Sequence, residues 1–85
     1  MRGMEVHLNG TTLCTAGIGA DAVLSAIVNV IGRDHGYDMM LRVGGLENDE
    51  FLTWSTHDLR IGDEIRIRIV ETDAIDSPAT SVNRG

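Results

Sequence analysis

The sequence contains no lysine, because all seven of its basic residues are arginines. This absence excludes Schiff-base chemistry on a lysine, the phosphate-binding lysine of a P-loop and the attachment of modifiers to a lysine side chain. There is also only one cysteine, Cys14. A single thiol excludes an internal disulfide and a zinc cluster of several thiolates within one chain, and it is typical of a reducing compartment.

Long hydrophobic runs and an excess of positive charge are missing as well. No run approaches the roughly 18 apolar residues that cross a bilayer, and no signal for secretion precedes the first strand pattern, so we expect a cytoplasmic location. The net charge of −6 opposes binding to nucleic acid or to an anionic membrane, because both need cationic groups. With 85 residues, the chain makes one small domain of modest stability.

The N-terminal residues have the pattern of a β-hairpin. Apolar and polar residues alternate over residues 4–8, Asn9-Gly10 follows, and an extended pattern then resumes. Asn-Gly between two such runs is a strong hairpin signal, because both residues tolerate the positive φ of a two-residue turn. In the simplest register Val6 lies opposite Leu13, and Cys14 lies on the other face of the hairpin.

Residues 22–31 have the pattern of an amphipathic helix. The apolar residues recur at helical spacing and form one stripe, made of Val23, Leu24, Ile27, Val28 and Ile31. Asp21 stands where an N-cap carboxylate accepts hydrogen bonds from free backbone N–H groups, and Gly32 or Gly36 can end the helix. We expect this helix to pack one face against a sheet.

Two further strands are predicted over residues 38–43 and 51–55. The polar residues 47–50 make a turn between them, and Gly44-Gly45 permits a bulge or a bend. A second hairpin is therefore expected here.

The final strand is predicted over residues 63–71. Isoleucine and arginine alternate strictly from Ile65 to Ile69, which is typical of a strand with one buried face. Residues 72–85 lack periodicity and apolar content, so they are interpreted as a mobile C-terminal tail that follows a single domain of residues 1–71.

The predicted order is β-β-α-β-β-β, and the last strand is reached through Leu59-x-x-Gly62-Asp63-x-Ile65. Together with Leu8-Asn9-Gly10 at the end of the first strand, this order resembles the ubiquitin-like β-grasp superfamily, in particular its small sulfur carriers. The resemblance covers about residues 4–71. It implies an α+β fold in which one helix packs on one face of a mixed sheet.

The resemblance also implies a function for the C-terminus. Sulfur carriers and ubiquitin-type modifiers act through a terminal Gly-Gly whose carboxylate is adenylated. This chain has one glycine, Gly85, at that end. Gly85 is accordingly the residue at which a carrier function would operate.

Arrangements that catalysis or metal binding requires are not found in the sequence. No serine stands in a Gly-x-Ser-x-Gly elbow, and Cys14 has only His7 as a neighbour that could activate it. His7, His35 and His57 lack the helical spacing of paired metal ligands. We therefore expect no enzymatic activity, no metal and no cofactor. A reactive Cys14, or a metal site between a loop histidine and Asp34, Asp38 or Asp58, remains an alternative.

Arginine and tryptophan provide the candidate binding residues. Arg66 and Arg68 share one face of the last strand, and Arg42 joins them if its strand lies in the same sheet. Guanidinium groups on a polar face suit carboxylates of a partner protein, and Trp54 with Phe51 offers a second candidate surface. The alternative is structural: the arginines pair across strands with Glu5 or Glu64, or simply keep an exposed face soluble, while Trp54 packs in the core.

These features predict a small non-catalytic module that binds another protein, as an adaptor, an inhibitor or an immunity-type partner, through an exposed sheet face or edge strand. One alternative is a ubiquitin-like carrier or modifier that is activated at Gly85. Another is an accessory subunit of a larger enzyme. A homodimer formed through the edge strand or Trp54 also stays open, because small domains often gain stability by association.

Overall fold

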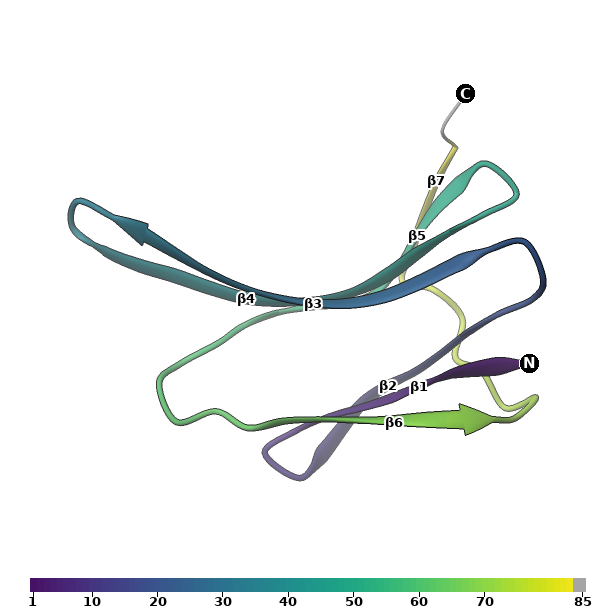
Figure 1. Ribbon diagram of the computed structural model, residues 1–85, viewed down its shortest axis with the longest axis horizontal. Coiled ribbons are helices and arrows are strands. Elements are labelled where there is room, and N and C mark those ends of the chain that lie inside the picture. Colours follow the sequence, from purple (N-terminus) through teal and green to yellow (C-terminus); the bar gives the residue numbers. More distant parts are fainter. Residues whose placement is uncertain (84–85) are drawn as a thin grey trace.

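The computed structural model describes residues 1–83, which form seven strands in two antiparallel sheets (Figure 1). Sheet A has the order β2-β1-β6 and contains β1 (Arg2–Leu8), β2 (Thr11–Ile18) and β6 (Ile65–Glu71). Sheet B has the order β3-β4-β5-β7 and contains β3 (Val23–Arg33), β4 (Gly36–Glu47), β5 (Glu50–Asp58) and β7 (Thr80–Asn83). The described residues contain no helix, and hence none that could cross a lipid bilayer.

The predicted α+β fold with a packed helix is therefore wrong. The residues expected to form the helix make β3, which pairs with β4 along its whole length. Asp21, the expected N-cap, has a φ of 59° and lies in the turn before β3. β3 is rich in valine and isoleucine, whose branched Cβ restricts χ1 and favours strands. The spacing of its apolar residues fits a strand that has apolar side chains on both faces. It fits the apolar stripe of a helix equally well.

The first hairpin is confirmed, but its register contains a bulge. Leu8 lies opposite Thr11 as expected, whereas Val6 lies opposite Cys14, because the register shifts between Val6 and His7. Leu13 is the extra residue on β2. A bulge of one residue reverses the faces of all positions beyond it. Cys14 consequently lies on the buried face, opposite to the prediction.

The second hairpin and its bulge are also confirmed. β4 and β5 are joined by Asn48 and Asp49, which have positive φ values of 52° and 60°. The register shifts between Val43 and Gly44, so that Trp54 is the extra residue on β5. A Cβ at Gly45 would lie 2.3 Å from the carbonyl oxygen of Val23, so β3 can approach this closely only because Gly45 has no side chain.

The core lies between the inner faces of the two sheets. Its buried side chains are Val6, Leu8, Cys14 and Ala16 from sheet A and Leu41, Val43, Leu52 and Trp54 from sheet B. The sheets cover each other only in part. Figure 1 shows the β3–β4 hairpin running past the end of sheet A. Ile67 and Ile69 on β6 also remain exposed, although the register places them on the inner face with Val6 and Met4.

The segment after β6, predicted to be a mobile tail, lies against the sandwich as far as it is described. The Asp76 N–H donates to the carbonyl oxygen of Thr15 at 2.9 Å, and the Thr15 N–H donates to the Asp76 carboxylate at 2.7 Å. The Trp54 indole N–H donates to the Asp76 carbonyl oxygen at 2.8 Å. β7 then pairs with β5. Asp76 thus joins the segment to both sheets.

Candidate protein-binding surface

A row of apolar side chains crosses all four strands on the outer face of sheet B. Strand pairing places Val23 opposite Leu46, Leu46 opposite Phe51 and Phe51 opposite Val82. Side chains at directly opposed positions lie on the same face of a sheet. Three of the four, Val23, Phe51 and Val82, are exposed. We call these four residues the apolar row.

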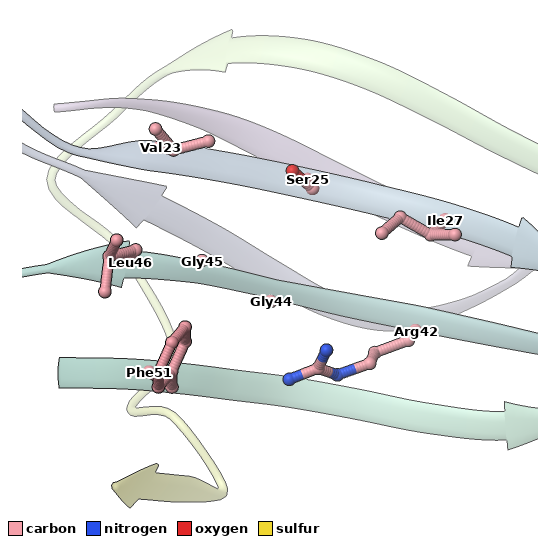
Figure 2. Close-up of a pocket in the computed structure, with 8 residues that line it drawn as sticks. All are labelled: Val23, Ser25, Ile27, Arg42, Gly44, Gly45, Leu46 and Phe51. Atoms are coloured by element: carbon pink, nitrogen blue, oxygen red, sulfur yellow. The ribbon is translucent and has the colours of Figure 1, made fainter. Parts of the chain in front are cut away.

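Next to the apolar row the sheet surface is hollowed into a shallow depression of about 170 Å³ (Figure 2). Its lining is made of Val23, Ser25, Ile27, Arg42, Gly44, Gly45, Leu46 and Phe51. Figure 2 shows Leu46 and Phe51 on one side of Gly44 and the Arg42 side chain on the other. The floor is low because Gly44 has no side chain there. A Cβ at Gly44 would lie 2.7 Å from the Leu52 carbonyl oxygen and 3.8 Å from the Arg42 guanidinium.

Among the described residues, Arg42 brings the only charge to the lining of this depression. Its Nη2 donates to the Thr53 hydroxyl oxygen at 3.3 Å. No carboxylate within residues 1–83 forms an ion pair with Arg42. A guanidinium has five N–H donors in a planar fork that matches a carboxylate. Most of the N–H donors of Arg42 therefore have no acceptor within residues 1–83.

Arg66 and Arg68 lie on the opposite side of the molecule and do not share a surface with Arg42. They belong to β6 of sheet A, where Arg66 lies opposite His7 and Arg68 opposite Glu5. Within the described residues neither arginine forms an ion pair, although Glu5 contacts His7 at 2.8 Å. β6 is an edge strand, and charged side chains on an edge hinder pairing with another chain. The structural alternative, an exposed and soluble face, fits this position.

Trp54 lies in the core, where its side chain is only 8% exposed. Its indole N–H donates to the Asp76 carbonyl oxygen rather than facing solvent. Trp54 thus occupies the position that the packing alternative describes, and it is not part of the outer surface of sheet B.

Cys14 is buried in the same core. Burial, and secondarily the negative charge of Asp76, raise the pKa of the Cys14 thiol above its ordinary value. A raised pKa keeps the thiol neutral, and the neutral thiol is a poor nucleophile. The geometry therefore gives no support to a reactive cysteine.

The described residues also contain no group of three or more His, Cys, Asp or Glu side chains placed to hold a metal ion. His57 Nδ1 lies 2.8 Å from the backbone carbonyl oxygen of Asp58, and His7 contacts Glu5 and Thr12. Gly85, the predicted carrier terminus, lies outside the described residues, so the structure does not test it.

Sequence reasoning named Arg42 as a candidate but did not connect it with the apolar residues around it. Val23 and Ile27 were placed in the buried stripe of a helix, and Val82 was placed in the tail. Phe51 was named with Trp54 as a second candidate surface, and it was not connected with Arg42. The missing information was the order of the strands, since only cross-strand register brings these four residues to one surface.

Comparison with known proteins adds no relative to this description. The chain matches no family model, no curated protein and no solved structure. The resemblance to the ubiquitin-like superfamily stays a prediction from sequence, and the α+β fold that it implies is not the fold of residues 1–83.

Proposed function

We propose that this chain is a non-catalytic protein-binding module whose partner docks on the outer face of sheet B. The observation that carries this proposal is the apolar row beside Arg42, a cation with no carboxylate partner among the described residues. Contiguous exposed apolar side chains with a polar rim are typical of protein interaction sites. Apolar burial supplies the free energy of binding there, and charge supplies orientation and specificity.

The size of the depression favours a protein partner over a small molecule. Pockets for small ligands usually measure about 300–1,000 Å³ and enclose most of the ligand. This depression measures about 170 Å³ and lies open on a sheet surface. Such a volume suits one or two apolar side chains of a partner. We therefore expect the partner to present an apolar residue to the depression and an Asp or Glu carboxylate to Arg42.

An adaptor, an inhibitor, an immunity-type protein and an accessory subunit of an enzyme all use a surface of this kind. They differ in the identity of the partner and not in the chemistry of the contact. Arg66, Arg68 and Trp54 are left out of this proposal, because the first two lie on sheet A and the third lies in the core.

The test is affinity capture from native cell lysate with an N-terminally tagged full chain and two pairs of variants. Phe51→Asp removes part of the apolar row, and Arg42→Glu reverses the charge. Arg66→Glu and Arg68→Glu are the matched controls on the other sheet. We expect one stoichiometric partner to be retained by the wild type and by both controls, and retention to fall at least about tenfold for Phe51→Asp and Arg42→Glu.

Charge reversal in the partner then tests the predicted chemistry. An acidic partner residue changed to arginine is expected to restore binding to Arg42→Glu. Loss of the partner with the controls, and not with the sheet B variants, would overturn the proposal. So would intact-mass analysis that finds the chain joined covalently through Gly85, because that result indicates a carrier.

A further inference from the structure

β3 is an edge strand without the protection that edges normally have. Within residues 1–83 the order of sheet B gives β3 one hydrogen-bonded neighbour, β4, and leaves its other backbone edge unpaired. From Val23 to Gly32 the strand has no charged residue and no proline. Exposed edges are usually blocked by charges, proline or bulges, as Arg66 and Arg68 illustrate on β6. A long uncharged edge of this kind is a template for another strand.

The side chains of β3 are as open as its backbone. Val30, on the face toward sheet A, is 64% exposed, and Val28 on the same face is also exposed. Ile27 and Ile31 are exposed on the outer face. The end of β3 next to the turn into β4 belongs to the part of the hairpin that extends past sheet A in Figure 1. Apolar residues on both faces of an unpaired edge strand favour burial by a neighbouring chain.

We propose that the occupant of this edge is a second copy of the same chain, with β3 pairing antiparallel to β3 about a two-fold axis at Ile27. This register is self-complementary on both faces. On the outer face Val23 meets Ile31, and Ser25 meets Asn29. On the inner face Leu24 meets Val30, and Ala26 meets Val28. Apolar side chains thereby meet apolar ones, and polar side chains meet polar ones.

Charges at the two ends of β3 complete the match. Asp21 lies two residues before the strand, and Arg33 is its last residue. Asp21 lies in the turn before β3, so pairing about Ile27 brings that turn of one copy close to Arg33 of the second copy at each end of the interface. Arg33 contacts Asp38 of its own chain through Nε, which leaves the Nη groups for Asp21. Opposite charges at both ends favour antiparallel pairing of two identical strands.

Neighbouring registers lack this complementarity. A shift of one residue places outer side chains opposite inner ones, which a continuous sheet does not allow. Centring the pair on Val28 keeps the faces aligned, but it sets Ser25 against Ile31 and Asn29 against Ile27. Two polar side chains on each copy would then lose their polar neighbours. The sequence of β3 thus selects the register centred on Ile27.

Sedimentation velocity over a concentration series tests this dimer on the full chain. The wild type is expected to approach twice the chain mass. Val30→Lys adds a charge opposite Leu24 of the second copy, and we expect it to raise the dimer dissociation constant at least about tenfold. Ile69→Lys is the matched control, because Ile69 is 70% exposed on β6 of the other sheet. Far-UV circular dichroism checks that both variants are folded.

A charge exchange tests the register. Asp21→Arg and Arg33→Asp each place like charges together and are expected to weaken the dimer, whereas the double variant is expected to restore it. A wild type that stays monomeric at all concentrations overturns the proposal. So does a dimer that tolerates Val30→Lys and is lost with Ile69→Lys. A double variant no tighter than the single ones overturns the register.

This inference goes beyond the proposed function, because it concerns pairing at the backbone edge of β3 and not docking on the outer face of sheet B. Neither Val30 nor the charged pair lines the depression. Val30→Lys is accordingly expected to retain the captured partner, and Arg42→Glu is expected to retain the dimer. Failure of one proposal is therefore distinguishable from failure of the other.

Discussion

At the scale of single residues, side-chain hydrogen bonds join two turns that are far apart in the sequence. The Asn9 side chain donates to one Asp63 carboxylate oxygen at 2.9 Å and accepts from the Glu64 N–H at 2.9 Å. The Arg60 N–H donates to the other Asp63 oxygen at 2.7 Å. These bonds favour the ionised carboxylate. The hydrogen bond from Asn9, and then that from Arg60, lower the pKa of Asp63 below its ordinary value.

This lowered pKa predicts a pH-dependent stability. A carboxyl group whose folded-state pKa is depressed contributes stability above its unfolded-state pKa, and it loses that contribution as the pH falls through the folded-state pKa. Asp63→Asn is therefore expected to lower the melting temperature by a few degrees at pH 7 and by much less at pH 2.5. Thermal unfolding followed by circular dichroism at both pH values measures this. A difference of the same size at both would contradict the assigned role of the charge.

At the scale of elements, Trp54 controls how residues 72–83 attach to the sandwich. Trp54, the extra residue of the β5 bulge, lies in the core, where its N–H reaches the Asp76 carbonyl oxygen. Trp54→Phe removes that donor and leaves the carbonyl without this bond, so we expect a loss of about 1–3 kcal/mol in the free energy of unfolding.

Amide hydrogen exchange locates this effect. We expect faster exchange at Asp76 and along β7 in Trp54→Phe, and unchanged exchange in β1, which is held by two neighbouring strands. The same measurement on the wild type tests the predicted mobility of the C-terminal segment. Uniformly faster exchange throughout the variant would show that Trp54 supports the whole core instead of this segment.

At the scale of the whole molecule, stability depends on a small core between two partly overlapping sheets. Leu41 is fully buried, with 0% exposure, and is the largest such side chain. Leu41→Ala is expected to lower the free energy of unfolding by about 2–5 kcal/mol, because the substitution removes buried apolar surface and leaves a cavity. Ile61→Ala is the matched control, since Ile61 is 94% exposed, and its effect should stay within about 0.5 kcal/mol. Urea unfolding measures both, and equal effects would contradict the assigned core.

Much of the strand structure was predictable from the sequence. The helix predicted for residues 22–31 was wrong, because these residues form a strand. Asn9-Gly10 located the first turn, because both residues tolerate the positive φ that this turn requires. Gly44-Gly45 marked the place on β4 where the register shifts, although the extra residue of that bulge lies on β5. The apolar positions of residues 23–31 fit a helix and a strand, and the sequence alone favoured the wrong one. Pairing with β4, which is a contact between separate segments, decided between them.

The candidate site divides in the same way. The sequence named Arg42 as a candidate binding residue, because a guanidinium fork has a chemistry of its own, independent of its surroundings. Its association with Arg66 and Arg68 depended on which strands share a sheet, and the strand order places them on opposite sides of the molecule. In the sequence, each residue of the apolar row is an ordinary strand residue. The four residues form one surface only because four strands pair in this register.

The sequence by itself determined the turns at Asn9-Gly10 and residues 47–50, the alternation along β6, the excess of negative charge and the absence of lysine chemistry, since these are properties of single residues and their nearest neighbours. Only the tertiary structure decided that β3 is a strand, that Cys14 and Trp54 face the core and that the outer face of sheet B is apolar around one arginine. Each of these depends on hydrogen-bond register between distant segments, where a shift of one residue exchanges the buried and the exposed face.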